Sequence, residues 1–483
     1  MPVAKRTRRD VSVPYWQSEC GRAVVYVGDC LEVMSHMKPD QFHAVVTDPP
    51  YGLEFMGKEW DAPWKNNRLI DPRDARDPKH NPTGKTVSPF IGAKITYDSD
   101  SYRYQEWFFN RAEAMLRVAR PGAHLLSFGG TRMWHRMACA VEDANWEIRD
   151  TLMWVYGSGF PKSHDVSKGI DKLLGAEREV VGKEYGAVQD EAVVFDTQRC
   201  GWKSEYDLKV PATDDAKRWS GFGTALKPAV EPIVVARKSF TGSVAQCVLD
   251  NGCGGLNIDG CRVGTTGTDV EKFVATHTST GSGVYQFNSG ETGDITMNGN
   301  LYKTQKDGRW PANFVHDGSD EVVDLFPEQA GGGGGPKVGG GNAIASVDGG
   351  YKNGRSTVGH KDNGSAARFF YSAKADHTDR PHGKGATVHP TVKPLDLMKW
   401  LVRLVCARGG VVLDPFMGSG STGCAAIEEG MWFVGIEQSR EYADIAVGRL
   451  KLSLAKVPVG EKLEVGKMVA ASGQTPPPPK VLR

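Results

Sequence analysis

The chain lacks several features that would quickly assign it to a class of protein. Its nine cysteines form no CxxC pair, and the one cluster, Cys247, Cys253 and Cys261, does not have the spacing of a usual zinc site. No stretch approaches the roughly 20 apolar residues that a membrane helix needs. Residues 1–10 are basic, but no apolar run follows them, so they do not resemble a signal peptide. We therefore expect a reduced, cytoplasmic protein with no metal site and no membrane partner.

The chain also lacks an excess of either charge. It has 59 Lys and Arg against 58 Asp and Glu, which leaves a net charge of +1. Bulk charge therefore does not indicate a nucleic-acid partner, and any basic face must be local. The basic N-terminal arm, residues 1–19, could contact phosphates, and a solvated, disordered arm is the alternative.

Strands and helices alternate at both ends of the chain. In the first part, apolar runs typical of strands cover residues 23–27, 42–47, 123–128 and 146–156, and helical spacing covers 31–37, 106–118 and 132–141. In the last part, the pattern predicts helices at 394–406 and 440–450 and strands at 411–413 and 432–436. The segment 414–422 turns from the first of these strands into a further helix that runs through Ile427. This alternation predicts an α/β fold with a doubly wound, mostly parallel sheet covered on both faces.

The middle of the chain has a weaker pattern. Short strand-like pieces at 232–236 and 313–316 lie among glycine-rich segments, over a length too great for a loop in a compact domain. The chain has 483 residues, whereas single cores stop growing at roughly 250–300. We therefore predict one core that is interrupted by an insertion. The predicted parts are a basic arm (1–19), a first half of the core (20–160), an inserted region (161–385), a second half (386–455) and an extended tail (456–483).

A glycine-rich turn follows the strand predicted at 411–413. Gly418, Gly420 and Gly423 fit the GxGxxG pattern, and Glu437 lies 19 residues after Gly418 at the end of the next predicted strand. Glycines let a backbone approach a ligand closely, and an acid in that position can accept hydrogen bonds from ribose hydroxyls. The turn therefore predicts a cofactor that contains adenosine, and it leaves NAD and S-adenosylmethionine both open.

Asp414 bears on the choice between these two cofactors. Its carboxylate stands at the entrance of the turn, where the pyrophosphate of a dinucleotide would pass, and negative charge there disfavours NAD. The same charge suits a ligand with a cationic amine and a sulfonium. The alternative role for Asp414 is that of a helix cap or turn residue.

The segment Asp48-Pro49-Pro50-Tyr51 directly follows the strand predicted at 42–47. It therefore lies at the carboxyl end of a strand, where open α/β sheets bind ligands. The exocyclic amine of a base is a poor nucleophile because its lone pair is delocalised into the ring. Asp48 and the carbonyl of Pro49 could accept from its N–H groups and favour a pyramidal nitrogen, while Tyr51 could stack on a base flipped out of the duplex. A proline-rich turn with a capping Asp is the alternative.

Taken together, the motifs resemble those of the amino-group DNA methyltransferases. Residues 47–52 (TDPPYG) look like the catalytic motif of that family, and residues 413–422 (LDPFMGSGST) look like its cofactor motif. The catalytic motif comes first and the cofactor motif last, an order that is similar to the β class, whose target-recognition region lies between them. Residues 389–394 (HPTVKP) and 28–30 (GDC) resemble further cofactor-binding elements of the family.

The resemblance implies a Rossmann-like methyltransferase core with S-adenosylmethionine as cofactor. Asp48, Pro49, Pro50 and Tyr51 would be catalytic. Glu437 would hold the ribose, Asp29 would meet the adenine edge, and Thr391 and Lys393 would hold the methionine carboxylate. The other cofactor-binding residues that it implies are Cys30, Pro394, Asp414, Pro415, Phe416, Gly418, Ser419, Gly420, Ser421, Thr422 and Gln438.

The implied reaction is direct methyl transfer to the N6 amino group of adenine in double-stranded DNA, of the kind used in restriction-modification. Family members with Asp at the first motif position are mostly adenine-specific, whereas Ser is usual for cytosine N4, which is the alternative target. No Pro-Cys dipeptide occurs, which disfavours cytosine C5 methylation. Two other classes stay open: an NAD-dependent oxidoreductase, which leaves Asp48–Tyr51 unexplained, and an inactive DNA-binding protein with a methylase core.

The resemblance also implies partners and a setting. The inserted region would contact DNA, and β-class relatives are often dimers, so a homodimer is an implied assembly. Two segments, 256–260 (LNIDG) and 310–313 (WPAN), resemble segments of phage and prophage members, which places the protein in a bacterial or phage-infected cell. Candidate phosphate ligands and one stacking side chain in the inserted region are Arg199, Lys203, Lys209, Lys217, Arg218 and Trp219.

Overall fold

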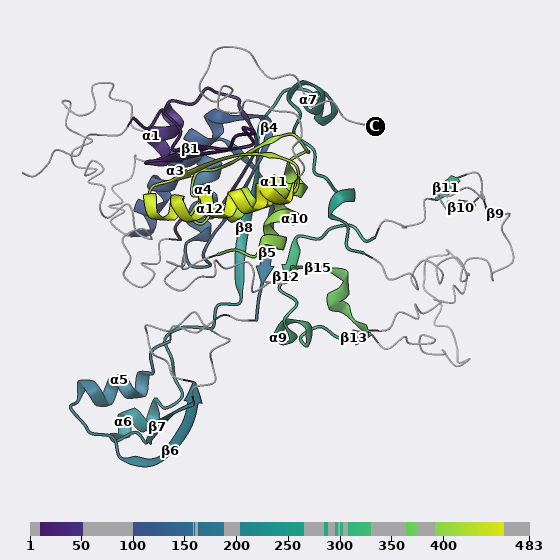
Figure 1. The fold of residues 1–483 in the computed structure, drawn as a ribbon. Helices are drawn as coiled ribbons and strands as arrows, with labels where there is room; N and C mark the ends of the chain where they lie inside the picture. Colours follow the sequence, from purple (N-terminus) through teal and green to yellow (C-terminus); the bar gives the residue numbers. More distant parts are fainter. Residues whose placement is uncertain are drawn as a thin grey trace, which may run out of the picture. The chain divides into compact units, whose positions relative to one another are not determined.

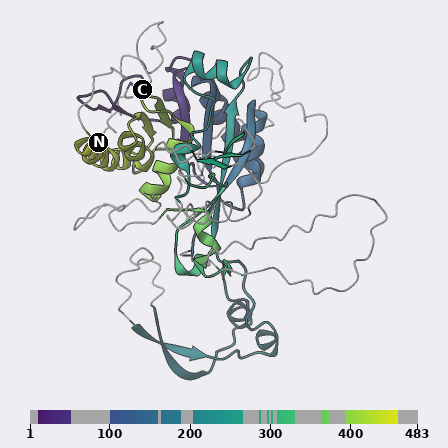
Figure 2. The same ribbon diagram turned by 90° about the vertical axis from the view of Figure 1, so that its right-hand side faces the viewer.

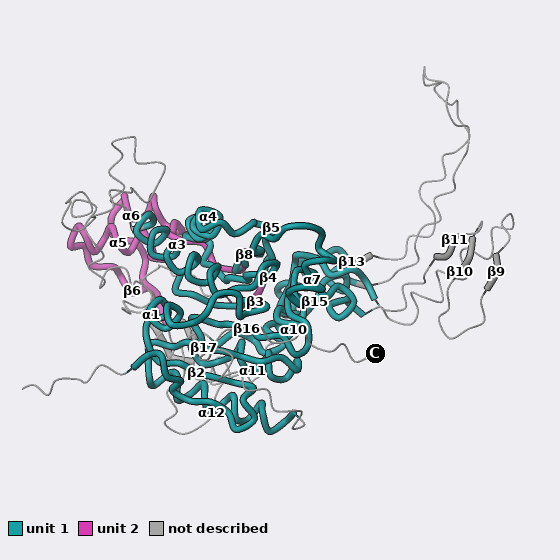
Figure 3. The backbone as a smooth tube through the Cα atoms, turned by 90° about the horizontal axis from the view of Figure 1, so that it is seen from above, with its two compact units in different colours: residues 1–155, 231–483 teal, residues 156–230 magenta. Residues whose placement is uncertain are grey.

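The computed structural model describes residues 10–51, 100–157, 159, 163–187, 203–264, 285–287, 295–297, 300–302, 308–329, 364–373 and 392–457. The chain divides into two compact units, shown in Figure 3. Unit 1 contains residues 1–155 and 231–483, and unit 2 contains residues 156–230. The start of the predicted basic arm, the predicted cofactor ligand Thr391 and the predicted tail beyond residue 457 lie outside the described residues.

Unit 1 is built on one mixed sheet of ten strands (Figure 1). Their spatial order is β1 (Trp16–Gln17), β2 (Ala23–Val27), β17 (Trp432–Glu437), β16 (Val411–Asp414), β3 (Phe42–Thr47), β4 (Ala119–Phe128), β8 (Val230–Lys238), β5 (Trp146–Val155), β12 (Phe314–His316) and β15 (Tyr371–Ser372). The neighbours from β2 to β4 all pair in parallel. β1 runs antiparallel to β2, and β8 runs antiparallel to β4. The predicted α/β fold with a mostly parallel sheet is confirmed.

Helices cover both faces of this sheet (Figure 1; Figure 2). One face carries α1 (Cys30–Ser35), α3 (Asp100–Val118) and α4 (Trp134–Asp143), whose apolar side chains join one buried cluster with alternate residues of the strands. The other carries α10 (Leu395–Val405), α11 (Ser421–Glu428) and α12 (Arg440–Lys456). Alternate strand residues point to opposite faces, so a strand such as β3, buried along its whole length, supplies both layers.

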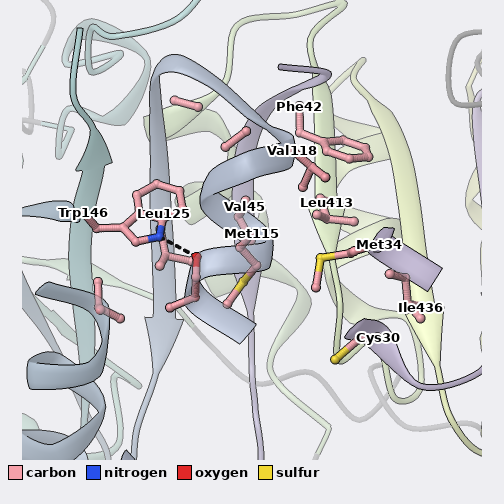
Figure 4. Close-up of a cluster of buried hydrophobic side chains, with 14 of the residues drawn as sticks. Cys30, Met34, Phe42, Val45, Met115, Val118, Leu125, Trp146, Leu413 and Ile436 are labelled. Atoms are coloured by element: carbon pink, nitrogen blue, oxygen red, sulfur yellow. Dashed lines mark hydrogen bonds between the residues drawn. The ribbon is translucent and has the colours of Figure 1, made fainter. Parts of the chain in front are cut away.

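Figure 4 shows part of this buried cluster, in which Val45 of β3, Leu125 of β4 and Leu413 of β16 lie between strands and helices. The Trp146 indole donates to the carbonyl of Ala112 at 2.9 Å, which satisfies a polar group inside the core. At roughly 25 cal/mol per Å² of apolar area, such side chains supply most of the stabilisation of a domain. The strand ends are therefore held by a rigid support.

Most predicted elements of unit 1 lie where the sequence places them, with differences at their ends. The helix predicted at 106–118 begins six residues earlier, since α3 starts at Asp100. Tyr104, Trp107 and Phe108 are fully buried, and their helical spacing continues the apolar face of α3 toward its start. The strand predicted at 123–128 begins at Ala119, directly after the helix, and Gly122 with a φ of 84° lies inside it.

The described residues of the predicted inserted region, 161–385, fall in both units. Residues 156–230 make up unit 2, whereas β8, β12 and β15 belong to the sheet of unit 1. The other described elements of unit 1 are short. They are α7 (Val244–Asn251), η4 (Asp259–Cys261), β9 (Tyr285–Phe287), β10 (Ile295–Met297), β11 (Asn300–Tyr302), α9 (Asp320–Val323), β13 (Glu328–Gln329), β14 (Gly364–Ser365) and η5 (Ala366–Phe369).

Unit 2 consists of α5 (Val166–Leu173), an antiparallel pair formed by β6 (Val180–Ala187) and β7 (Lys203–Lys209), and α6 (Asp214–Arg218). A buried carboxylate organises it. Asp171 accepts from the Thr213 hydroxyl at 2.7 Å, from the backbone N–H groups of Ala212 and Thr213 at 3.0 and 3.1 Å, and from Arg178 at 2.7 Å. Asp171 therefore joins α5 to the start of α6 across the hairpin.

Among the helices of the described segments, none combines the length and apolarity that crossing a bilayer would require.

Candidate active site

Parallel strands bring four of the predicted site segments to one edge of the sheet. β3, β16, β17 and β2 all end there, and Asp48, Asp414, Glu437 and Asp29 stand at or just after those ends. β8 runs in the opposite direction beside β4, so its beginning reaches the same edge. This places Glu231, the second residue of β8, beside residues that follow strand ends.

The segment after β3 makes a network of charged and polar contacts. Lys393 lies 2.8 Å from Asp48 Oδ2 and 3.0 Å from Glu231 Oε2. The Tyr51 hydroxyl accepts from Lys393 Nζ at 3.1 Å and donates to Glu231 Oε2 at 3.0 Å. The Lys393 ammonium also lies over the Phe128 ring, 4.9 Å from its centroid. Lys393 is only 8% exposed, so these contacts replace its water shell.

The two oxygens of Asp48 are in different situations. Oδ2 pairs with Lys393, whereas Oδ1 is buried and has no hydrogen-bond partner in the part of the chain that the structure describes. Asp48 also lines a pocket that reaches the glycine turn. The lining residues are Asp48, Lys393, Met398, Asp414, Phe416, Met417, Gly418, Ser419, Ser421 and Thr422. The pocket therefore joins the predicted catalytic segment to the predicted cofactor turn.

Asp414 is buried at the end of β16. Its Oδ1 accepts from the Thr47 hydroxyl at 2.6 Å and from the Phe416 backbone N–H at 3.1 Å. Burial raises the pKa of Asp414 to about 6, and the hydrogen bonds from Thr422, Thr47 and Phe416 counteract only part of that rise. At neutral pH the side chain is thus a poorly solvated carboxylate facing a pocket, a setting that favours a cationic ligand.

The glycine turn has the backbone shape that its sequence predicts. Gly418 and Gly420 have φ values of 52° and 81°, which lie in the left-handed region that favours glycine. Gly423 allows α11 to approach β17, because a Cβ there would lie 2.5 Å from the Phe433 ring. Glu437 holds the turn from the next strand, since its carboxylate accepts from the N–H groups of Gly418 at 2.9 Å and Ser439 at 2.8 Å. Burial raises its pKa above the ordinary range.

The hydroxyls of Ser419 and Ser421 contact α12. Arg449 donates to the Ser419 hydroxyl at 2.9 Å and to the Ser421 hydroxyl at 3.0 Å. It also donates to the Ser419 carbonyl at 2.9 Å. These two predicted cofactor residues line the pocket, and their hydroxyls are also the contacts that tie the turn to α12.

Asp29 caps α1. Its Oδ1 accepts from the Leu31 N–H at 2.9 Å, and its Oδ2 lies 3.5 Å from Arg111 of α3. The structure thus gives Asp29 the capping role that is common for Asp at a helix start. The next residue, Cys30, has its side chain in the buried apolar cluster (Figure 4), and burial raises its pKa to about 12.

The remaining predicted residues have simpler positions. Pro394 precedes α10 as its N-cap, Pro49 and Pro415 are buried, and Gln438 is exposed beside Glu437. Three residues that the sequence did not single out also take part. Trp107 of α3 lies against the Phe416 ring at 5.7 Å between centroids, and Arg111 lies over the same Trp107 ring at 4.0 Å. The third is Glu231, and its only signal was that it directly precedes the strand-like run predicted at 232–236.

The fold and the site are those of an α/β protein in which one pocket joins a glycine turn to Asp48, a half-buried carboxylate with one buried oxygen that has no hydrogen-bond partner among the described residues. A sequence model of the N6/N4 DNA methylase family matches residues 42–448 of the chain. The chain therefore belongs to this family of DNA methylases. Enzymes of the family take their methyl group from S-adenosylmethionine, which confirms the cofactor predicted from the sequence.

Individual relatives are more distant. The chain is 21% identical to the type II methyltransferase M.HindIII of Haemophilus influenzae over 430 residues, which cover 88% of this chain and 94% of that protein. It is 43% identical to the type II methyltransferase M.ScaI of Streptomyces caespitosus over 65 residues, 14% of this chain and 21% of that one.

Among solved structures, the M1.HpyAVI–SAM complex matches at 14% identity with a TM-score of 0.32, covering 89% of this chain and 99% of that one. The cytosine-N4-specific PvuII DNA methyltransferase matches at 10% identity with a TM-score of 0.38, covering 90% of this chain and 88% of that one. TM-scores this low do not allow residues to be carried over.

Proposed function

We propose that this DNA methylase transfers a methyl group from S-adenosylmethionine to the N6 amino group of adenine at specific sites in double-stranded DNA. The observation that carries the proposal is Asp48 Oδ1, a buried carboxylate oxygen that has no hydrogen-bond partner among the described residues and whose residue lines the pocket. A buried acceptor of this kind is costly unless a ligand satisfies it, and an amino group supplies the matching donor.

Asp48 and the Pro49 carbonyl hold the target amine in this proposal. By accepting hydrogen bonds from the N–H groups of the amine, they favour a pyramidal nitrogen and stabilise the positive charge that develops there. When bound, S-adenosylmethionine supplies an electrophilic methyl group on a sulfonium. Most of the rate enhancement then comes from orientation of the two reactants in one pocket.

The cofactor residues follow from the pocket and its charges. Asp414 offers a buried carboxylate to the cationic end of the cofactor, and Phe416 offers a ring for the adenine. Gly418 and Gly420 let the backbone approach closely, and Glu437 is the proposed ligand of the ribose. Asp29 is the proposed contact of the adenine edge, from its position after β2.

Lys393 takes a different role in the proposal from the one that the resemblance implies. An ammonium has three N–H donors, and Asp48, Glu231 and Tyr51 offer it three acceptors at 2.8, 3.0 and 3.1 Å. No N–H donor of Lys393 is then left for the methionine carboxylate of the cofactor. Thr391 stays a predicted ligand of that carboxylate.

The choice of adenine rests on the Asp at position 48, because cytosine-N4 members of the family usually have Ser there.

Unit 2 is the proposed target-recognition part. Its Trp219 is 42% exposed and packs edge-on against Phe222, which leaves a ring available for stacking, while Lys217 pairs with Asp214 at 3.0 Å. A homodimer, a cytoplasmic location, a phage or prophage origin and a restriction partner stay predictions.

The proposal is tested by incubating the protein with labelled S-adenosylmethionine and unmethylated genomic DNA, then analysing the nucleosides by mass spectrometry. We expect N6-methyladenine as the product, and sequencing of the methylated DNA gives its sequence context. N4-methylcytosine as the sole product would contradict the adenine assignment and leave the enzyme class intact. No incorporated methyl group, with intact cofactor binding, would contradict the function itself.

A further inference from the structure

Glu231 occupies a position at the active-site edge that no motif of the chain explains. It is the second residue of β8, the strand that runs antiparallel to β4. The pairing of Phe128 with Ile233 and the hydrogen bond from the Gly129 N–H to the Pro232 carbonyl, at 2.9 Å, hold the start of β8 beside the end of β4. The Glu231 side chain is therefore delivered by the sheet itself.

Three side chains form a closed ring of contacts at this point. Lys393 donates to Glu231 and to the Tyr51 hydroxyl, and the Tyr51 hydroxyl donates to Glu231 Oε2 at 3.0 Å. The Tyr51 ring rests on the backbone at Gly130, where a Cβ would lie 3.1 Å from the ring. These contacts use two of the three N–H donors of the Lys393 ammonium. The third faces Asp48 Oδ2, which lies 2.8 Å from the ammonium nitrogen.

This arrangement decides which oxygen of Asp48 is available. A carboxylate can rotate and exchange its two oxygens, unless one of them is held. Lys393 holds Oδ2, and Oδ1 is the buried oxygen with no hydrogen-bond partner among the described residues. Lys393 is in turn kept in place by Glu231 and Tyr51, so the orientation of Asp48 depends on a residue 183 positions away in the sequence (231 − 48).

We propose that Glu231 is a positioning residue of the methyl-transfer site: it holds the Lys393 ammonium and the Tyr51 hydroxyl so that Asp48 presents one fixed carboxylate oxygen to the target amine. This inference rests on the proposed function and adds to it a residue from the antiparallel strand. Glu231 does not touch the reacting atoms in this arrangement, and it acts through Lys393.

The carboxylate of Glu231, in addition to that of Asp48, stabilises the charged form of Lys393. Burial lowers the pKa of Lys393, while the facing carboxylates of Asp48 and Glu231 raise it, and the result is a pKa well above the ordinary range. Among the described residues, the Tyr51 hydroxyl and the uncharged Phe128 ring also face Lys393, and burial together with the same two carboxylates raises the pKa of that hydroxyl. Asp414 lines the same pocket as Asp48 and Lys393, and the charge of Asp48 contributes to the raised pKa of Asp414. The presence of Glu231 therefore favours the charged form of Lys393.

The test is Glu231→Gln, which keeps the size of the side chain and removes its charge. We expect kcat for DNA methylation to fall about 10- to 100-fold, with KM for S-adenosylmethionine changed less than about threefold, since Glu231 does not line the cofactor pocket. We also expect a pH effect. With one carboxylate fewer, the pKa of Lys393 falls, so the alkaline loss of kcat begins at a lower pH than in the wild type.

The matched control is Glu147→Gln on β5. Glu147 pairs at 2.8 Å with Arg237, which lies near the other end of β8. This variant therefore also removes the charge of a carboxylate that contacts β8, but at a position away from the site. We expect its kcat and pH profile to match the wild type.

Two results would overturn the proposal. One is a Glu231→Gln enzyme with a wild-type kcat and pH profile. The other is a loss of kcat accompanied by an equal loss of cofactor affinity and melting temperature with the alkaline limb unmoved, because that pattern belongs to a merely structural residue. If instead the wild-type protein methylates no DNA, the proposed function fails, and this outcome is distinguishable because it does not depend on any variant.

Discussion

The two halves of the proposed site are built in different ways. The cofactor half is nearly continuous in sequence: β16, the glycine turn and the start of α11 follow one another, and Glu437 joins them from the next strand. The catalytic half is assembled from distant segments, since Tyr51 contacts Glu231 across 180 positions and Lys393 across 342. One half depends on local backbone shape, and the other depends on a charge network that exists only in the folded sheet.

The difference has a physical origin. A phosphate-free adenosyl cofactor needs close backbone approach, which glycines with positive φ provide within a few residues. A reacting amine needs a fixed acceptor, and fixing a carboxylate requires partners on several sides. The two halves are joined directly by the Thr47 hydroxyl, which donates to Asp414 at 2.6 Å across 367 positions. Substitutions can therefore weaken one half, the other or their connection.

The largest effect is expected at Asp48. Replacement by Ala removes the acceptor of the target amine, so kcat should fall at least about 100- to 1,000-fold, whereas the affinity for S-adenosylmethionine should change little. Single-turnover methylation and calorimetric titration of the cofactor measure the two quantities separately. Near-wild-type methylation by Asp48→Ala would disprove the assignment of the catalytic half.

The reverse pattern is expected at Gly420. Its φ is 81°, and a Cβ there would lie 3.0 Å from the Cβ of Ala446, so Gly420→Ala strains the turn by about 1–2 kcal/mol. We expect cofactor affinity to fall roughly 10-fold while kcat at saturating cofactor is kept.

The control for this variant is Gly448→Ala on α12, where a Cβ would meet no atom within 4 Å. It should leave the affinity unchanged. Equal losses in both variants would show that the effect comes from general destabilisation and not from the turn.

Cofactor affinity should depend on pH through Asp414. Its pKa is raised to about 6, so the carboxylate is ionised above that pH and becomes neutral as the pH falls through it. A neutral Asp414 no longer attracts a cationic ligand, and the dissociation constant should therefore rise several-fold between about pH 7 and pH 5. Calorimetry over this range measures it. A pH dependence of the same size in Asp414→Asn would assign the titration to another group.

The smallest effect is expected at Thr47. Thr47→Val removes a hydrogen bond to the charged form of Asp414, so the pKa of Asp414 rises further and the acid loss of affinity begins at a higher pH. At pH 8 we expect only about a two- to fivefold change in affinity. Thr47→Ser keeps the hydroxyl and should behave as the wild type. An unchanged profile in Thr47→Val would mean that the bond between the two halves does not tune the carboxylate.

Part of the fold and site follows directly from local sequence. The strand predicted at 42–47 is β3 with the same bounds, and the strand at 23–27 is β2, because short apolar runs between turn residues have few other solutions. The local sequence of the insertion predicts less of the structure. β8, β12 and β15 come from it and complete the sheet, and their short apolar runs do not reveal which strand they pair with or in which direction.

The family, the cofactor and the two strand-end motifs follow from the amino-acid sequence alone, since each depends on residues that are close together in the chain. The antiparallel position of β8 and the contacts of Lys393 depend instead on the folded chain. The reason is that an ion pair depends on distance in space, and neither Glu231 nor Lys393 carries a local signal of its partner. The orientation of the Asp48 carboxylate therefore emerges from strand pairing, which no local pattern around residue 48 encodes.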